Sequence, residues 1–330
     1  MNLQVTGGAN PTSAAERTLL VRGIRLQAEG ILAFELSDPD GADLPDVSAG
    51  SHVDVHLPDG QVRSYSLAGD PFDNSHWMLG VLREAKGRGG SKTLHDQVRV
   101  GDRLRIGAPR NAFALQSGAD HVILLAGGIG ITPIKAMAHV LASEGRSFDL
   151  HYCARSIRHA AFIEELRAFV PEGRLHLHFD GGDPALGLDI AALLSGNQPG
   201  RHVYFCGPSG FMKACSDASA HWDVGTVHSE HFKVPEQKPK ALPDGAFEVK
   251  LARSGITLQV QPEQTIVRAI ELAGHRVPTS CLSGLCGACK VNYLEGEVDH
   301  ADYILTDDEK RHCLTVCVSR AASPSLVLDL

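Results

Sequence analysis

The sequence predicts a multidomain protein of the β, α/β and α+β classes: an antiparallel β-barrel, a doubly wound parallel sheet, and a small C-terminal domain. Three observations support this. Short strands separated by turns fill the first third, strands alternate with helices in the middle, and five of the eight cysteines fall in the last 50 residues. At 330 residues the chain is long enough for each domain to have its own core.

We expect the barrel in residues 1–117. Apolar and polar residues alternate there in short runs separated by Gly, Pro and Asp, which is typical of a small antiparallel barrel. The runs lie at 18–26, 31–38, 51–57, 63–69, 76–84 and 102–108. One short helix is predicted at 92–98.

Residues 118–232 have a different pattern. The run 121–126 is continuously apolar, as a buried parallel strand is, and a glycine turn and a helical stretch at 133–145 follow it. Strands and helices then alternate as far as residue 207, which predicts a doubly wound parallel sheet.

A linker is predicted at 233–245, because this segment holds three prolines and few apolar residues. The last domain, 246–330, begins with a predicted hairpin whose turn lies at 253–255. A short amphipathic helix follows, with Thr265 as its N-cap and Gly274 as its C-terminal stop.

The composition of the chain argues against several classes of function and location. A net charge of −8 argues against nucleic acid as a partner, since a phosphate-binding surface needs an excess of Lys and Arg. The N-terminus has no signal-peptide pattern, and no stretch reaches the ~18 apolar residues that span a bilayer. We therefore expect a cytoplasmic protein without a membrane part. In that reducing compartment, clustered cysteines indicate a metal or cluster site rather than disulfides.

The cysteine cluster has a specific spacing. Cys281, Cys286 and Cys289 form the C-x4-C-x2-C pattern of plant-type [2Fe-2S] sites, which need a fourth ligand downstream. Gly284 and Gly287 let backbone N–H groups approach the cluster sulfurs. A structural zinc site is the alternative, although zinc ligands usually pair C-x2-C with a second such pair or with His. By counting alone, the fourth ligand is either of the two cysteines that remain nearby, Cys313 and Cys317.

A glycine-rich turn follows the first parallel strand and opens a helix, which is a favourable place for a pyrophosphate. Its candidate binding residues are Gly127, Gly128, Gly130, Thr132 and Pro133. The turn departs from the dehydrogenase fingerprint, because no acidic residue ends the next strand to hold a ribose. Arg155 stands there instead.

A second glycine-rich turn ends a later strand of the same sheet. Its candidate nucleotide-binding residues are Cys206, Gly207 and Pro208. Two such turns at the carboxyl edge of one parallel sheet make a ligand crevice. Cys206 then lies beside a nicotinamide, or it is an inert core thiol.

The barrel carries two further candidate motifs. In Arg63-Ser64-Tyr65-Ser66, the arginine fork suits a phosphate and the tyrosine ring can pack beside a flavin. The run 87–91, which includes Gly90 and Ser91, leads into a helix start and offers another phosphate position.

Taken in order, R-S-Y-S, G-R-G-G-S, G-G-I-G-I-T-P, C-G-P-S-G-F-M and C-x4-C-x2-C resemble the phthalate dioxygenase reductase family over nearly the whole chain. The resemblance implies a flavin-binding barrel, an NAD domain and a plant-type β-grasp ferredoxin domain. It also implies FMN rather than FAD, NADH as donor, and a terminal Rieske-type oxygenase as partner. That oxygenase is an aromatic-ring dioxygenase or an O- or N-demethylase. The family suggests a monomer.

The resemblance also assigns individual residues. Arg63 and Ser91 look like FMN phosphate ligands, and Phe232 resembles an aromatic ring that packs near the flavin. Cys317 looks like the fourth cluster ligand, because the family's last cysteine precedes a terminal strand. Residues that resemble flavin neighbours are Tyr65, Ser66, Val81 and Arg83. Leu82 departs from the polar residue expected between the last two.

The predicted activity is hydride transfer from NADH to FMN, followed by single-electron transfer to the cluster. Ser66, Cys206 and Phe232 are the residues expected nearest the reacting atoms. Arg155 leaves NADPH open as a donor, since it suits a 2′-phosphate. The alternatives are an FAD-containing reductase for another oxygenase class and a non-enzymatic redox or zinc-binding regulatory protein. Acidic residues around 307–309 predict a salt-sensitive docking surface or, equally, a solvated face.

Overall fold

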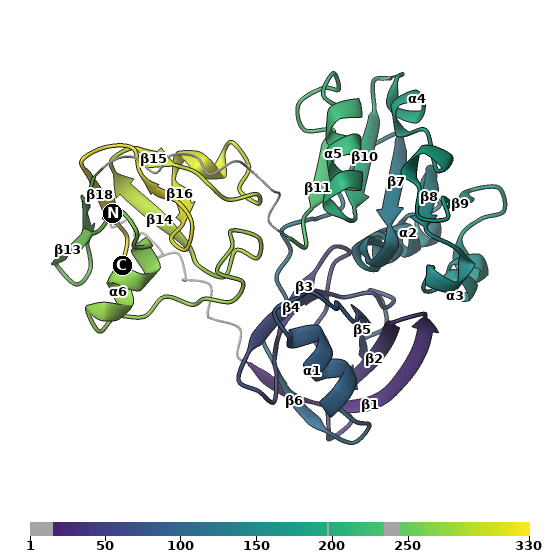
Figure 1. Ribbon diagram of the computed structural model, residues 1–330, viewed down its shortest axis with the longest axis horizontal. Helices are drawn as coiled ribbons and strands as arrows, with labels where there is room; N and C mark the ends of the chain where they lie inside the picture. Colours follow the sequence, from purple (N-terminus) through teal and green to yellow (C-terminus); the bar gives the residue numbers. More distant parts are fainter. Residues whose placement is uncertain (1–15, 197, 234–244) are drawn as a thin grey trace, which may run out of the picture.

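The structure, a computed structural model, describes residues 16–196, 198–233 and 245–330. Figure 1 shows three lobes: the barrel, the α/β lobe next to it, and the C-terminal lobe beside them. The predicted linker lies outside the described residues, except for its two ends. Within the described residues, no helix is long and apolar enough to cross a membrane.

The first lobe is a six-stranded antiparallel sheet with the order β4-β3-β6-β1-β2-β5. A bridge between Leu67 and Leu79 joins its two edge strands and closes it into a barrel. Alternate residues fill the interior, for example Val53, Phe34 and Val81. The elements are β1 Arg17–Ala28, β2 Ile31–Ser37, β3 His52–His56, β4 Val62–Ser66, β5 Trp77–Leu82, α1 Gly90–Gln97 and β6 Arg103–Ile106.

The second lobe is a five-stranded parallel sheet with the order β11-β10-β7-β8-β9. The chain adds β8 and β9 on one side of β7, then crosses over to add β10 and β11 on the other side. The boundary between β7 and β10 is therefore a switch point, where a ligand crevice forms. Its strands are β7 His121–Gly127, β8 Phe148–Ala154, β9 Leu175–Phe179, β10 Arg201–Cys206 and β11 Val227–Glu230. Its helices are α2 Ile131–Ser143, α3 Ile163–Phe169, α4 Ile190–Leu194 and α5 Ser209–Ala218, with 3-10 turns at Gly128–Gly130, Ile157–His159 and Pro184–Leu186.

The third lobe has a mixed sheet with the order β13-β12-β18-β14-β16 and one helix packed on it. The helix begins as predicted, because the Thr265 hydroxyl accepts a hydrogen bond from the Arg268 N–H at 3.2 Å. Its elements are β12 Phe247–Leu251, β13 Ile256–Val260, α6 Ile266–Leu272, β14 Lys290–Glu295, β15 Val298–Asp299, the 3-10 turn Glu309–Arg311, β16 Cys313–Thr315, β17 Arg320–Ala321 and β18 Ser325–Leu328. The predicted fold class is confirmed.

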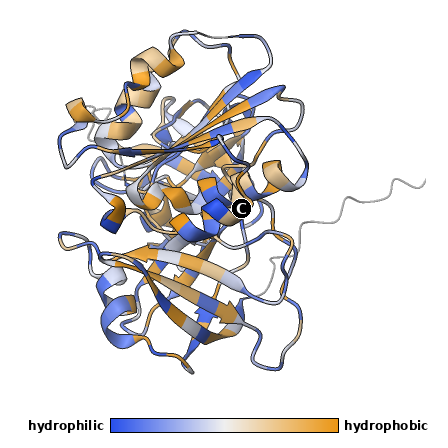
Figure 2. Ribbon diagram, turned by 90° about the vertical axis from the view of Figure 1, so that its right-hand side faces the viewer, coloured by the Kyte–Doolittle hydropathy of each residue, from blue (hydrophilic) through white to orange (hydrophobic). Residues whose placement is uncertain are grey.

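The lobes are packed in different ways. Ala33, Ala68 and Met78 of the barrel belong to one apolar core with residues of α2 and α3, so the first two lobes are fused. The buried residues of the C-terminal lobe form a core of their own. Figure 2 shows apolar residues along the strands and polar residues at the loops.

Candidate functional site

A cavity of about 470 Å³ lies where the three lobes meet, which is within the usual size of cofactor sites. The barrel supplies most of its wall. The cavity is lined by His52, Val62, Arg63, Ser64, Tyr65, Ser66, Gly80, Leu82, Glu84, Lys86, Gly87, Arg88, Gly90 and Ser91 of the barrel, Ile129, Thr132, Glu230, His231, Phe232 and Lys233 of the α/β lobe, and Cys281, Ser283, Leu285 and Cys286 of the C-terminal lobe.

One end of the cavity suits an anion. Arg63 and Arg88 lie there beside the first turn of α1, where backbone N–H groups are free. A Cβ at Gly90 would fall 2.6 Å from Cγ of Arg63, so only glycine lets the helix start approach the arginine. The Ser91 hydroxyl accepts a hydrogen bond from the Glu84 N–H at 3.0 Å and keeps its own hydrogen to donate. This end therefore fits a phosphate group.

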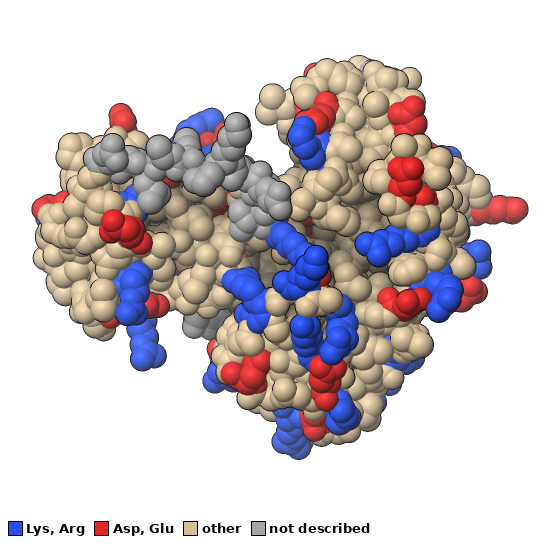
Figure 3. All heavy atoms as spheres, viewed as in Figure 1, with Lys and Arg blue, Asp and Glu red and all other residues tan. Residues whose placement is uncertain are grey.

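Figure 3 shows Lys and Arg side chains gathered at the junction of the three lobes. The cations that line the cavity there are Arg63, Lys86, Arg88 and Lys233. Lys233 is paired with Glu84 at 2.6 Å, so this end is cationic but partly neutralised.

The other end brings two lobes together through a carboxyl group. The Ser66 hydroxyl at the end of β4 donates a hydrogen bond to Oε2 of Glu230, the last residue of β11, at 3.0 Å. Removal from water raises the pKa of Glu230 to about 7, and the Ser66 hydrogen bond opposes that rise. Phe232, 39% exposed, and Thr132 line the same cavity.

Glu230 is a functional candidate that was not predicted from the sequence. The signal that could have found it was position: an acidic residue that ends a strand of a parallel sheet lies at the carboxyl edge of the sheet, where the ligand crevice forms.

The two glycine-rich turns are packed against each other. A Cβ at Gly130 would collide with the carbonyl oxygen of Cys206, and one at Gly207 would meet Phe211 Cδ1 at 2.6 Å. Thr132 and Pro133 begin α2, and Pro208 is the N-cap of α5. Cys206 is fully buried beside Glu230, and burial raises the pKa of its thiol. The glycines thus let the crevice floor form.

The predicted ligands outside the cavity lining include Val81, Arg83 and Arg155, besides most residues of the two glycine-rich turns and Cys289 and Cys317. Val81 points into the barrel core, because side chains alternate along β5 and its neighbours Gly80 and Leu82 face the cavity. The Arg83 side chain is exposed and donates to Asp96 at 2.8 Å. Arg155 is an exposed residue just after β8, at the carboxyl edge of the sheet.

The cysteine loop is held by turns that suit converging thiols. Leu282 has a left-handed φ of 53°, and Gly284 and Gly287 have φ of 70° and 68°. A Cβ at Gly284 would lie 2.8 Å from Cγ2 of Val318. The N–H groups of Ser283 and Leu285 both donate to the Cys281 sulfur at 3.4 Å, as they would to a cluster sulfur.

The thiols interact in pairs. A hydrogen bond from the Cys286 thiol lowers the pKa of Cys281. The hydrogen bond between the Cys289 and Cys317 thiols lowers the pKa of Cys289 and raises the pKa of Cys317. Cys313, in contrast, donates its S–H to Oδ1 of Asn292 at 3.0 Å. The structure therefore groups Cys317, not Cys313, with the loop cysteines, and four thiolates with backbone donors are a donor set that fits [2Fe-2S].

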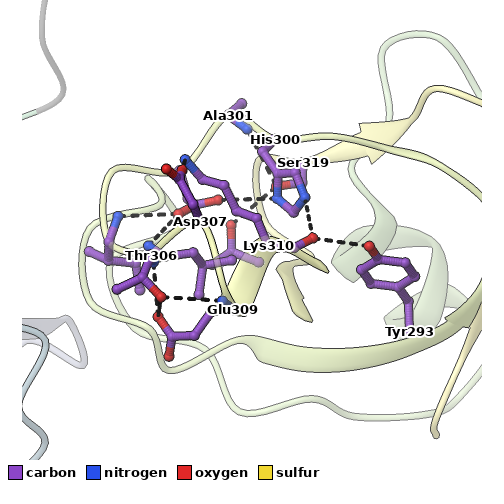
Figure 4. A network of polar contacts seen from close by, with 12 residues as sticks. Tyr293, His300, Ala301, Thr306, Asp307, Glu309, Lys310 and Ser319 are labelled. Atoms are coloured by element: carbon purple, nitrogen blue, oxygen red, sulfur yellow. Dashed lines mark hydrogen bonds and ion pairs between the residues drawn. The ribbon is translucent and has the colours of Figure 1, made fainter. Parts of the chain in front are cut away.

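The three acidic residues of the predicted surface at 307–309 each pair with a nearby basic residue. Glu309 pairs with Lys290 at 2.9 Å, Asp308 with Arg311 at 2.9 Å, and Asp307 with Lys310 at 4.0 Å. Figure 4 shows Asp307, Glu309 and Lys310 within a polar network. The network includes hydrogen bonds of Tyr293 and His300 to the Lys310 carbonyl, both 3.0 Å. The face thus carries mixed charge rather than a single negative field.

Comparisons with known proteins agree with this geometry. A family model described as a 2Fe-2S iron-sulfur cluster binding domain matches residues 249–322. The chain is 47% identical over 321 residues to the reductase subunit of a tert-butanol monooxygenase / tert-amyl alcohol desaturase from Aquincola tertiaricarbonis, covering 94% of this chain and 95% of the relative.

It is also 42% identical over 304 residues to phthalate dioxygenase reductase of Burkholderia cepacia, covering 92% of this chain and 94% of the relative. A solved structure of a phthalate dioxygenase reductase, described as modular for electron transfer from pyridine nucleotides to [2Fe-2S], superposes with a TM-score of 0.71 at 40% identity and covers 98% of this chain and 100% of that chain. The chain therefore belongs to the phthalate dioxygenase reductase family, oxidoreductases that pass electrons from a nicotinamide through a flavin to a [2Fe-2S] cluster as reductase components of Rieske-type oxygenases and demethylases.

Proposed function

We propose that this chain takes a hydride from NADH onto FMN in the three-lobe cavity and delivers electrons singly to a [2Fe-2S] cluster held by Cys281, Cys286, Cys289 and Cys317. The single observation that supports it most is the cavity wall, which contains two of those cysteines together with the flavin motifs and Thr132 of the first glycine-rich turn. A bound flavin would supply the chemistry that links a two-electron donor to a one-electron cluster.

The choice of FMN rests on the cationic end of the cavity. Arg63, Ser91 and the free N–H groups of α1 would together bind a terminal phosphate, and Gly90 allows that close approach. Tyr65 lines the same wall, and its ring would pack against the cofactor. A monophosphate at this end is what FMN presents.

The nucleotide-binding side comes from the α/β lobe. The glycine turn at 127–130 and the second turn at 206–208 would hold the pyrophosphate and nicotinamide ribose at the switch point. Phe232 lines the cavity between these turns and the barrel, so it would have to move aside for a nicotinamide ring to reach the cavity. Arg155 at the sheet edge would contact the adenosine end, and the family resemblance favours NADH.

Ser66 and Glu230 would handle the proton that accompanies hydride chemistry. In the structure the Ser66 hydroxyl already donates to Glu230 Oε2, so a proton that arrives at Ser66 Oγ has an acceptor within 3.0 Å. With a pKa of about 7, Glu230 can both take and release a proton near neutral pH. Cys206, which is buried beside Glu230, would help to exclude water from the end of the cavity where Ser66 and Glu230 meet.

The acceptor proposed for the electrons is the terminal oxygenase of a Rieske-type system. The relative from Aquincola tertiaricarbonis is a reductase subunit of such a multi-component enzyme, which supports a protein acceptor here. We expect a monomer that works in the cytoplasm, where reducing conditions suit eight free cysteines.

An anaerobic titration of the purified protein with NADH tests this function. Visible spectroscopy should show bleaching of flavin and iron–sulfur bands, chromatography of acid-released flavin should give FMN, and metal analysis should give two irons per chain. Released FAD would correct the cofactor. A colourless protein, or one that holds zinc, would overturn the reductase proposal.

A further inference from the structure

The contacts between the C-terminal lobe and the barrel are concentrated in one place. Three hydrogen bonds and one contact between hydroxyl groups, Ser64 with Ser280, join the described residues of these two lobes, and all four end on Ser280 or on the carbonyl oxygen of Cys286. Both residues belong to the cysteine loop. We call this contact the seam; its barrel members are His52, Asp54, Ser64 and Arg110.

Asp54 is the centre of the seam. Its carboxylate accepts hydrogen bonds from the hydroxyls of Ser64 at 2.7 Å and Ser280 at 2.6 Å, and it pairs with the Arg110 guanidinium at 2.8 Å. Burial alone would raise its pKa, but Arg110 and the two serine hydroxyls hold the pKa of Asp54 below its ordinary value. The carboxylate is therefore charged, buried and fully partnered, which fixes Ser280 next to the first cluster cysteine.

The second cluster cysteine is held through its backbone. The Cys286 carbonyl oxygen accepts hydrogen bonds from His52 Nε2 at 3.2 Å and Arg110 Nε at 3.3 Å. His52 is 4% exposed, so its ring is enclosed at this contact, and its Nδ1 has no hydrogen-bond partner among the described residues.

His52 also lines the flavin cavity. One side chain therefore spans the distance from the cofactor space to a cluster ligand. Arg110 acts at two points, since its Nη2 binds Asp54 and its Nε binds the Cys286 carbonyl. Among the described residues, no apolar core is shared across this boundary. The seam therefore sets how the loop faces the barrel, and the rings of His231 and Tyr303, 5.6 Å apart, add a contact with the α/β lobe.

We propose that the seam is the docking latch for internal electron transfer, with Asp54 as its anchor and Arg110 and His52 as positioning residues that hold the cluster loop against the flavin cavity. This inference rests on the proposed function, because it assigns the seam a role in one of its two electron-transfer steps. The seam should control electron flow from the cavity to the cluster. Changing Arg110 should leave hydride transfer from NADH unaffected, since neither Arg110 nor Asp54 lines the cavity.

Arg110→Met tests the latch in the holoprotein, because it keeps the aliphatic stem and removes both hydrogen bonds. In anaerobic stopped-flow mixing with NADH, we expect flavin bleaching within twofold of the unmodified protein and cluster bleaching at least tenfold slower. Arg110→Lys should recover part of that loss. The matched control is Arg105→Met, which removes another barrel arginine paired with an acid, Glu16 at 3.2 Å, away from the cavity.

A second measurement does not depend on activity. Small-angle X-ray scattering should give a larger radius of gyration for Arg110→Met than for Arg105→Met, and amide exchange at 280–286 should be faster. An unchanged rate of cluster bleaching in Arg110→Met would overturn the proposal. Equal slowing of flavin bleaching and cluster bleaching would overturn it as well. If the unmodified protein held no flavin, the proposed function would fail, while the scattering comparison would still decide whether the seam docks the lobe.

Discussion

The barrel meets its two neighbours through two very different interfaces. Toward the α/β lobe it shares an apolar core, and Gly80 has no room for a side chain, because a Cβ there would lie 2.6 Å from Cγ2 of Thr132. Lys135 of α2 is buried in that interface and binds both the Ala68 carbonyl and Glu165 at 2.7 Å. Toward the C-terminal lobe the barrel has the polar seam.

The difference matches what each step needs. Hydride transfer requires two rings in direct contact and correct orientation, and a shared core holds two lobes in one arrangement. A cluster that must also serve an external acceptor gains from a contact made of a few hydrogen bonds, which contribute only about 0.5–1.5 kcal/mol each. The barrel is thus fixed to the α/β lobe by a shared core, and it is joined to the C-terminal lobe by the few hydrogen bonds of the seam.

The largest expected effect tests whether the C-terminal lobe can lose its cluster while the other two lobes still support flavin reduction. Cys317→Ser should remove nearly all cluster iron and its visible bands, because the fourth thiolate is lost. Flavin bleaching by NADH should persist, since the first two lobes do not depend on that core. Iron analysis and stopped-flow spectroscopy measure the two. Cys313→Ser is the matched control and should keep its iron; loss of iron there instead would reverse the ligand assignment.

The fused interface should be more costly to disturb. Lys135→Met leaves Glu165 and the Ala68 carbonyl without their buried partner, and it should destabilise the barrel and α/β lobe together by about 2 kcal/mol. Urea unfolding followed by flavin fluorescence measures this. Lys213→Met, which breaks an exposed pair with Asp217, should change stability by less than about 0.5 kcal/mol. Separate unfolding of the two lobes would contradict the shared core.

A smaller effect is expected at the hydrogen bond that joins β4 to β11 across the fused interface. Glu230 accepts from Ser66 when ionised, so NADH-driven turnover should rise with pH through about 7 and level off above it. Glu230→Gln should abolish that rise and lower the plateau by about tenfold to a hundredfold. Glu35→Gln, at a surface pair with Arg25, is the control. An unchanged pH profile would exclude Glu230 from proton handling.

The smallest effect is expected on the outer face of the C-terminal lobe. Because Asp307 and Asp308 have nearby basic partners, changing both to Asn should alter the rate of cytochrome c reduction by less than twofold at physiological salt. A loss above fivefold with a weaker salt dependence would restore the idea of an acidic docking surface.

Much of the architecture could be predicted from the sequence because its signals are local. Strand alternation, glycine turns and the C-x4-C-x2-C spacing depend on neighbouring residues, and the Thr265 cap and the hairpin turn at 253–255 formed as predicted. The acidic surface is more mixed in charge than its acidic residues alone indicate, because the i, i+3 partners Lys310 and Arg311 stand in the same segment, and its role in docking stays a prediction. Strand parity also shows why Leu82, not Val81, faces the cavity.

The seam could not be predicted in this way. Its hydrogen bonds join residues separated by as many as 234 positions, and single His, Asp and Arg residues in a barrel carry no pattern that announces a partner. Glu230 is similar, because its pKa is raised by burial in the folded protein and lowered in part by a hydrogen bond from Ser66 of another lobe. Contacts between lobes arise from three-dimensional packing, and one sequence holds no periodic trace of them.

The separate core of the C-terminal lobe has an evolutionary consequence. A module that has an apolar core of its own can be moved to another gene, or placed at another position in a chain, without repacking its host. To be useful in a new context, such a module needs only a compatible loop contact. A handful of substitutions around Ser280 and its barrel partners would then be enough to retarget an electron carrier, whereas exchanging the α/β lobe would demand that two cores change together.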